Sequence, residues 1–212
     1  MKDCVIITSI IETTSLPLSY SDIRSVYSHQ QRFEQTLETI DSVRKYLPGT
    51  TIVLVECSPE SEYMRCIREK VDVFINQYPN DKIRNGTHKG LCEAELMMKV
   101  FESFDLTEYR YIFKISGRYK LLDTFDINEW IVDKPVGCFT YNYSGPSIHT
   151  FFYKFTPREI DTLKNMFEQM IEMNVEECIE KCVYKALLPN IKFIEKIGIE
   201  ARWSCYNFTS VF

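Results

Sequence analysis

The chain has 212 residues, 45% of them hydrophobic and 14% aromatic, and its formal charge is −5 at pH 7. This length and composition are typical of one globular domain with a sizeable core and exclude a disordered chain. The acidic balance argues against a nucleic-acid partner, which usually requires a basic face, but one pocket of Arg and Lys suffices for a small anion.

The first half of the chain alternates between apolar runs and helical patterns. The expected strands are 5–11, 51–55, 71–75 and 111–115, and the expected helices run through 33–47, from Ser58-Pro59 onward and through 91–104. The strands are apolar without alternation, as parallel strands are when both faces of their sheet are covered. The polar segments 12–31 and 76–88 are long for plain connections, so we expect functional loops or lids there.

The second half of the chain continues the same domain with a different pattern. The expected elements are an antiparallel strand pair at 136–143 and 149–155, a helix after the capping box Thr156-Pro157-Arg158-Glu159, a helix at about 174–188 and a last strand at 192–199. No repeat or linker interrupts the chain, so we expect a single domain over 1–212. Strands that alternate with helices predict a doubly wound α/β sheet.

Cysteines and histidines are spaced in a way that does not suit a metal site. The chain has eight cysteines but no CxxC pair, and His29, His88 and His149 lie far apart, so no zinc site is expected. The cysteines suit the core of a protein in a reduced compartment. The first residues, MKDCVIITSII, carry an acid where a signal peptide is basic and are too short to span a bilayer. We expect a cytoplasmic protein without a transmembrane segment.

The most informative segment is the polar turn that ends the strand at 111–115. This strand runs into Ser116-Gly117-Arg118-Tyr119, and ligands of α/β proteins collect outside the carboxyl ends of such strands. Lys89-Gly90 opens the preceding helix, and Glu93 follows one turn later. A lysine, a helix N-terminus and an arginine that converge on one site favour a diphosphate. The alternative interpretation is a basic surface turn.

In the order of these motifs, the chain resembles the GT-A class of nucleotide-sugar glycosyltransferases. Within this class, the chain is similar to the glycosyltransferase domains of chlorella-virus proteins implicated in decorating the capsid glycan. The resemblance covers the whole chain and is carried by Arg32–Ser42, Glu56-Cys57-Ser58, Lys89–Ala94 and Phe113–Tyr119. GxGxxG, GxxxxGK[ST] and GxSxG are all absent, which removes the basis for dinucleotide, P-loop and acyl-transfer readings.

The resemblance implies a fold, a reaction and partners. The implied fold is GT-A-like and Rossmann-related, with a mixed, mostly parallel central sheet flanked by helices on both faces, a nucleotide-binding half at about 1–122 and an acceptor or catalytic half at about 123–212. The implied reaction moves a sugar from a UDP-sugar, such as UDP-glucose or a related UDP-hexose or deoxyhexose, to a hydroxyl of a glycan or glycoprotein acceptor. A viral protein of this kind would act in the host cytoplasm in capsid glycan synthesis, as part of a longer multidomain polypeptide.

The resemblance also implies which residues hold the donor. The nucleobase and ribose are expected at Thr8, Ser9, Ile10, Glu56 and Ser58, and the diphosphate at Arg32, Lys89 and Arg118. The other expected nucleotide-sugar-binding residues are Gly90, Glu93, Ser116, Gly117 and Tyr119. Thr8 and Ser9 equally suit ordinary turn chemistry at a strand end. Arg32 opposes the dipole at the start of its helix, so another partner is expected to hold it.

The metal site of the class is the largest departure. An Asp-x-Asp normally ends the central strand, whereas Ser116-Gly117-Arg118 stands here. A fixed guanidinium can neutralise a diphosphate by itself. Alternatively, Mn²⁺ or Mg²⁺ is held mainly by diphosphate oxygens, with Asp123 or Asp126 close in sequence. Because the class usually uses a metal, a divalent cation, foremost Mn²⁺, is expected.

For catalysis, the resemblance points to an acid at the start of a late helix. Glu177 fits this position and would deprotonate an acceptor or stabilise an oxocarbenium-like centre. Asn174 with Glu177 also matches a simple helix cap. His149 is the second catalytic candidate, and it would line an acceptor pocket with Tyr119 and Trp203.

Two other function classes compete with the transferase. The missing Asp-x-Asp allows a non-catalytic nucleotide-sugar or glycan-binding module on a degenerate fold. A nucleotidyltransferase that makes the sugar nucleotide would need a glycine-rich, basic loop after the first strand, and residues 12–20 are neither.

Overall fold

The computed structural model describes residues 2–142, 145–174, 178–205 and 209–212. Its centre is a seven-stranded sheet in the order β3-β2-β1-β4-β7-β6-β8. The strands are β1 (Lys2–Thr8), β2 (Thr51–Glu56), β3 (Val73–Asn76), β4 (Tyr109–Ser116), β6 (Val136–Asn142), β7 (Gly145–Phe155) and β8 (Lys192–Ile194). β1 to β4 are mutually parallel, β7 is antiparallel to both β4 and β6, and β8 is parallel to β6.

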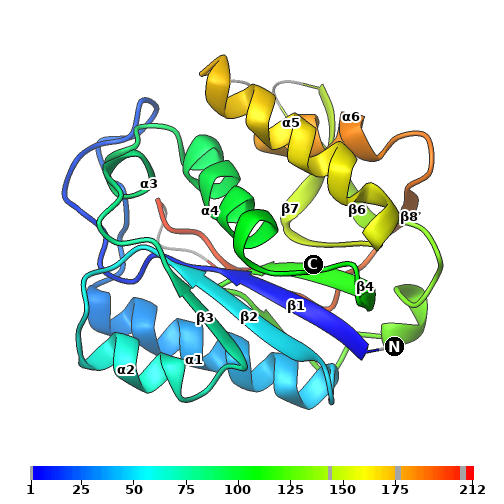
Figure 1. Ribbon diagram of the computed structural model, residues 1–212, viewed down its shortest axis with the longest axis horizontal. Coiled ribbons are helices and arrows are strands. Elements are labelled where there is room, and N and C mark those ends of the chain that lie inside the picture. Colours follow the sequence, from blue (N-terminus) through cyan, green and yellow to red (C-terminus); the bar gives the residue numbers. More distant parts are fainter. Residues whose placement is uncertain (1, 143–144, 175–177, 206–208) are drawn as a thin grey trace.

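Helices cover both faces of this sheet (Figure 1). One face carries α1 (His29–Tyr46) and α2 (Glu62–Arg68), and the other carries α4 (Lys89–Ser103), α5 (Ile160–Glu172) and α6 (Ile179–Leu187). Val5 and Ile7 pack with the first pair of helices, whereas Ile6 packs with the second group. Successive side chains of a strand point to opposite faces, so a strand between two apolar layers is apolar at most of its positions. The predicted mixed, mostly parallel α/β sheet is confirmed.

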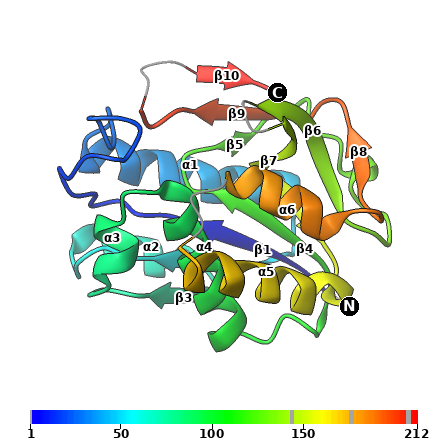
Figure 2. The ribbon, with the colours of Figure 1, turned by 90° about the horizontal axis from the view of Figure 1, so that it is seen from above.

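A second, three-stranded sheet of order β10-β9-β5 joins the turn after β4 to the end of the chain (Figure 2). It consists of β5 (Lys120–Leu121), β9 (Ile199–Arg202) and β10 (Thr209–Val211). The single strand expected at 192–199 is therefore wrong, because β8 ends at Ile194 and the chain turns at Gly198. Gly198 has φ 74°, and a Cβ there would lie 2.4 Å from the amide nitrogen of Phe125, so only glycine fits this turn.

Two helix starts also differ from expectation. α2 begins after Ser61 rather than at Ser58-Pro59, because the Ser58 hydroxyl is buried between the Glu56 carboxylate and the Glu12 amide. Asn174 does not begin a helix but follows α5 with φ 46°, and α6 begins after Cys178. The expected cap at Asn174 is therefore wrong, while its partner Glu177 lies outside the described residues.

Both long polar segments are ordered around the carboxyl ends of β1 and β2. The loop from Ser9 to Ser28 ends in a capping box of Ser28 and Gln31 that opens α1. The segment 76–88 contains the short helix α3 (Asp81–Asn85), and the amide of Ser19 in the first loop donates to the carbonyl of Thr87 in this segment. In the described part of the chain, no helix has the length and apolar character needed to cross a membrane.

Candidate functional site

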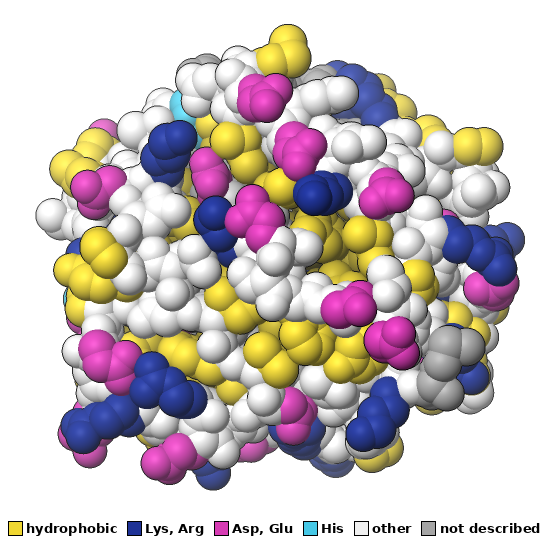
Figure 3. Space-filling view, viewed as in Figure 1, with side chains coloured by type: hydrophobic (Ala, Val, Ile, Leu, Met, Phe, Trp, Pro, Cys, Tyr) yellow, Lys and Arg dark blue, Asp and Glu magenta, His cyan; other side chains and the backbone are white. Residues whose placement is uncertain are grey.

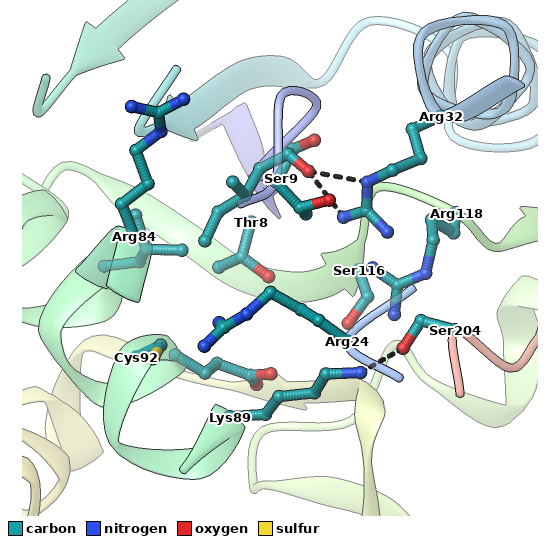
Figure 4. A pocket seen from close by; sticks show the side chains of 14 residues that line it. Thr8, Ser9, Arg24, Arg32, Arg84, Lys89, Cys92, Ser116, Arg118 and Ser204 are labelled. Atoms are coloured by element: carbon teal, nitrogen blue, oxygen red, sulfur yellow. Dashed lines mark hydrogen bonds between the residues drawn. The ribbon is translucent and has the colours of Figure 1, made fainter. Parts of the chain in front are cut away.

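A polar pocket opens at the carboxyl ends of β1 and β4 (Figure 4). The two strand ends supply Thr8, Ser9, Ile10, Ser116 and Arg118, α1 supplies Arg32, and α4 supplies Lys89, Cys92, Glu93 and Leu96. Thr13 and Arg24 come from the loop after β1, Arg84 comes from α3, and Ser204 comes from the segment after β9. Five of these side chains are cations and one is a carboxylate.

Eight of the residues predicted to hold the donor line this pocket together: Thr8, Ser9, Ile10, Arg32, Lys89, Glu93, Ser116 and Arg118. They meet because β1 and β4 are parallel neighbours, with Thr8 opposite Ser116. The carboxyl ends of neighbouring parallel strands lie at the same edge of a sheet. Whether these residues bind a nucleotide sugar stays a prediction at this point.

The turn after β4 is fixed against β1 and α1. The Gly117 amide donates to the carbonyl of Thr8 at 2.9 Å, and the Thr36 hydroxyl donates to the Gly117 carbonyl at 2.8 Å. A Cβ at position 117 would lie 3.0 Å from the Cβ of Ser9, so the close approach favours glycine. Gly117 thus does not line the pocket itself but places Ser116 and Arg118 in it.

Arg32 is a buried cation without an acidic partner among the described residues. Its Nε and Nη2 donate to the carbonyl of Ile10 at 2.8 and 2.5 Å, and its Nη1 donates to the Ser25 hydroxyl at 3.3 Å. These acceptors are the partners that its unfavourable place on the helix required. Burial, and then the cation of Arg118, lower the pKa of Arg32 to about 9.

Lys89, at the start of α4, reaches across the pocket to the C-terminal segment. Its ammonium donates to the Ser204 hydroxyl and, at 2.9 Å, to the Cys205 sulfur, as Figure 4 shows for Ser204. Burial, and then the charge of Arg118, lower the pKa of Lys89 to about 8. Lys89 is therefore mostly charged at neutral pH but is held next to a like charge.

Arg24 and Arg84 enter the pocket from the two long loops and were missed by the sequence analysis. Arg24 is 7% exposed and fastens its loop to the α3–α4 connection, because it donates to the carbonyls of Leu16 at 2.8 Å and Gly86 at 2.7 Å. Arg84 donates to the carbonyl of Glu12 at 3.3 Å. The signal in the sequence was the length of these polar loops, which marks a functional segment but not its individual residues.

Glu93, the one acid among the described residues that line the pocket, already has a partner. The fully buried Lys114 on β4 donates to Glu93 Oε1 at 2.5 Å, to the Ser116 hydroxyl at 3.0 Å and to the Thr150 carbonyl at 2.8 Å. Burial lowers the pKa of Lys114, whereas Glu93 opposes this effect. The ion pair fixes the Glu93 carboxylate at the pocket wall.

Four other predicted donor residues lie outside the pocket lining. Glu56 is fully buried and its Oε1 accepts from the amides of Ile11 and Cys57 and from the hydroxyl of Ser58, so Glu56 and Ser58 shape the loop after β1. Burial raises the pKa of Glu56. Gly90 and Tyr119 pack inward: a Cβ on Gly90 would lie 3.2 Å from Ile179, and the Tyr119 ring stacks edge-on against Phe151 at 5.0 Å.

His149 lies in an aromatic cluster rather than among the residues that line the pocket. Its ring is 4.7 Å from that of Phe151 and 4.8 Å from that of Phe212, and Trp203 contacts both phenylalanines. Burial lowers the pKa of His149, so it is neutral at pH 7. Its role, like that of Glu177 outside the described residues, stays a prediction.

The donor set of the pocket does not suit a metal held by the protein. Divalent cations such as Mn²⁺ and Mg²⁺ take oxygen ligands, foremost carboxylates. Within the described residues, no group of three His, Cys, Asp or Glu side chains is placed to hold a metal. Asp123 and Asp126 do not line the pocket, and the five cations around Glu93 would repel a further positive ion.

Comparisons with known proteins place the fold. No protein-family model and no curated protein matches the sequence. Among solved structures, the chain is similar to a CTP:phosphocholine cytidylyltransferase from Streptococcus pneumoniae (LicC), with a TM-score of 0.56 and 14% identity over 94% of this chain and 92% of that one.

Two glycosyltransferases have the same architecture. The galactosyltransferase LgtC, solved with donor and acceptor sugar analogues, has a TM-score of 0.53 and 8% identity over 90% of this chain and 72% of that one. A glycosyltransferase involved in glycosylation of the major capsid of PBCV-1 has a TM-score of 0.50 and 10% identity over 91% of this chain and 82% of that one. Identities this low show the fold alone: the chain has a GT-A-like α/β fold, which nucleotide-sugar glycosyltransferases and cytidylyltransferases share.

Proposed function

We propose that this protein is a glycosyltransferase that takes a sugar from a UDP-sugar, such as UDP-glucose or a related hexose or deoxyhexose, to a hydroxyl of a glycan. The observation that carries the proposal is the convergence of five cations at the carboxyl ends of β1 and β4 in a GT-A-like fold. Such a pocket suits a leaving diphosphate, because guanidinium and ammonium groups stabilise the charge that develops on it.

The remaining parts of the reaction are assigned to the walls of the pocket. Thr8, Ser9 and Ile10 at the end of β1 are proposed to hold the nucleoside, and Glu93 to accept a hydroxyl of the donor sugar. Glu177 and the neutral His149 are proposed to act on the acceptor side. An acceptor on a viral capsid glycoprotein, acted on in the host cytoplasm, is the narrower form of this proposal, and the PBCV-1 likeness is compatible with it.

A nucleotidyltransferase is the second candidate. Its support is the likeness to a cytidylyltransferase, together with Arg24 and Arg84, which bring basic groups from loop segments into the pocket although the loop after β1 has no basic, glycine-rich motif. The products separate the two reactions: a glycosyltransferase releases UDP from a UDP-sugar, whereas a nucleotidyltransferase releases pyrophosphate from CTP or UTP and a phosphorylated partner.

We expect UDP to raise the melting temperature more than GDP or CMP does, and we expect a panel of UDP-sugars to yield UDP in the presence of a glycan acceptor. Thermal-shift assays and a UDP-release assay measure the two effects. Pyrophosphate release from CTP or UTP would favour the second candidate. Tight UDP-sugar binding without release of either product would instead favour a non-catalytic binding module.

The affinity for UDP is expected to fall as the pH rises from 7 to 9. The pKa of Lys89 is about 8, so its ammonium is present to pair with the diphosphate below pH 8 and is progressively lost above it. At one unit above this pKa, the dissociation constant should be about tenfold higher. Titration calorimetry at pH 7 and at pH 9 measures the two dissociation constants. Lys89→Arg should keep only the smaller pH dependence that Arg32, with its pKa of about 9, contributes, and an equal fall in affinity in both proteins would remove Lys89 as the cause.

A further inference from the structure

The two positions that would carry acids in an Asp-x-Asp face the pocket in this chain as a hydroxyl and a cation. Ser116 and Arg118 both line the pocket, and Gly117 between them is fixed by Thr8 and Thr36. The turn thus has the place and the direction of a metal-binding motif but the opposite charge. Arg118 therefore presents a positive group to the ligand directly.

Among the described residues, the pocket cations form no ion pair with a carboxylate, in contrast to most arginines elsewhere in the chain. In the part of the chain that the structure describes, five arginines outside the pocket form ion pairs with carboxylates: Arg44, Arg68, Arg110, Arg158 and Arg202. No ion pair within the same residues involves the pocket cations Arg24, Arg32, Arg84, Lys89 and Arg118, which bond to carbonyls, hydroxyls and a thiol instead.

This one-sided charge is local. The chain has 30 acidic and 25 basic residues, and the face in Figure 3 shows acidic and basic side chains interspersed. Because acids are plentiful, the five cations and single carboxylate among the described residues that line the pocket are not a consequence of composition. That carboxylate, Glu93, is neutralised by Lys114 below it. The charge left over in the pocket is therefore available for an anion of several charges.

We infer that the pocket binds a nucleoside diphosphate as the free anion, with no divalent cation between the diphosphate and the protein. The inference rests on the proposed function for the nucleoside but not for the diphosphate. A diphosphate carries roughly −3 near pH 7, which the pocket cations match or exceed. A metal-bound diphosphate carries two fewer negative charges and would bring a cation close to Arg118 and Lys89.

The test is titration calorimetry of the 212-residue chain with UDP and with inorganic pyrophosphate, in EDTA and in Mn²⁺. Both ligands are expected to bind in EDTA, with dissociation constants within about threefold of those in Mn²⁺ or tighter. Binding that is tenfold or more weaker in EDTA would overturn the inference. The pyrophosphate measurement does not depend on turnover, so pyrophosphate binding in EDTA supports the inference even if no UDP-sugar is consumed. If UDP is released only with Mn²⁺ and pyrophosphate does not bind in EDTA, the inference is overturned but the proposed glycosyltransferase function stands.

A rebuilt metal motif gives an independent readout. The variant Ser116→Asp/Arg118→Asp is expected to lose at least about a hundredfold in UDP affinity in EDTA and to regain part of it in Mn²⁺. Arg65 is exposed and is not among the residues that line the pocket, so Arg65→Asp is the matched control and should bind UDP like the native chain in both buffers. If the double variant does not fold, Arg118→Ser is used for the same measurement. Unchanged affinity in EDTA for a folded variant would overturn the inference.

Discussion

Replacement of Arg118 by methionine is expected to weaken UDP binding about a hundredfold and, at the same time, to raise the melting temperature of the unliganded protein. The loss of affinity follows from a charge-assisted contact to phosphate, worth about 2–3 kcal/mol, where 1.4 kcal/mol is tenfold. The UDP affinity of Arg118→Lys should lie between those of the native chain and Arg118→Met, because lysine keeps the charge but not the planar guanidinium group.

The gain in stability follows from the sign of two pKa shifts. After burial, Arg118 is the largest cause of the lowered pKa values of both Arg32 and Lys89. A cation whose pKa is lower in the folded than in the unfolded chain destabilises the fold at pH values below its unfolded pKa, pH 7 included. Among the described residues, Arg118 makes a long hydrogen bond of 3.5 Å to the Arg202 carbonyl and lies 5.6 Å from the centre of the Tyr119 ring, and both contacts are weak. We therefore expect Arg118→Met to remove more repulsion with Arg32 and Lys89 than it loses in favourable contacts.

Calorimetry with UDP and thermal unfolding without ligand measure the two effects. About 1 kcal/mol of relief corresponds to roughly 2–4 °C for a domain of this size. Arg158→Met is the control: Arg158 is exposed and paired with Asp133, so neither quantity should change by much. A lower melting temperature for Arg118→Met would show that the pocket cations are not under mutual strain, and native UDP affinity would remove Arg118 from the diphosphate site.

The fold and the centre of the site could be predicted because both follow from strand order. Apolar runs without alternation indicate parallel strands covered on both faces, and parallel neighbours bring their carboxyl ends together. The placement of Thr8, Lys89, Ser116 and Arg118 around one pocket follows from that rule. The two apolar runs in the second half of the chain likewise predicted an antiparallel strand pair, which the structure contains as β6 and β7.

The rest could not be predicted, because it depends on how loops pack. Arg24 reaches the pocket only because its loop docks on the carbonyls of Asn85 and Gly86, about sixty residues away in sequence. The acid at the end of β2, Glu56, was expected at the nucleotide, yet nearby amides and a hydroxyl engage it and keep it buried. Sequence position gives the end of the strand but not the direction of the side chain.

The ion pair below the pocket offers the largest expected change in stability. The Lys114 side chain is completely buried and that of Glu93 is 23% exposed. Removal of one partner from a buried pair costs about 3–5 kcal/mol, because it leaves a charge that nothing compensates, whereas replacement of both by apolar side chains is often close to neutral. The surface pair of Lys99 and Glu102, at 30% and 45% exposure, is the matched control.

Glu93→Leu is therefore expected to lower the melting temperature by roughly 10 °C, which corresponds to about 3 kcal/mol. Lys114→Met should cost less, because Glu93 keeps Lys89 and Arg118 as neighbours in the pocket lining.

The double variant should unfold near the temperature of the native chain. A double-mutant cycle of chemical denaturation should therefore give a coupling energy of at least about 2 kcal/mol between Lys114 and Glu93, against less than about 0.5 kcal/mol between Lys99 and Glu102. The pKa of Lys114 is already lowered by burial, so the loss in Glu93→Leu should shrink as the pH rises towards the ordinary lysine pKa of about 10.4, because the folded variant releases the proton of Lys114 while the unfolded chain still holds it. An additive cycle, or a loss in Glu93→Leu that does not change with pH, would show that the charge of Lys114 is compensated by Ser116 and Thr150 alone.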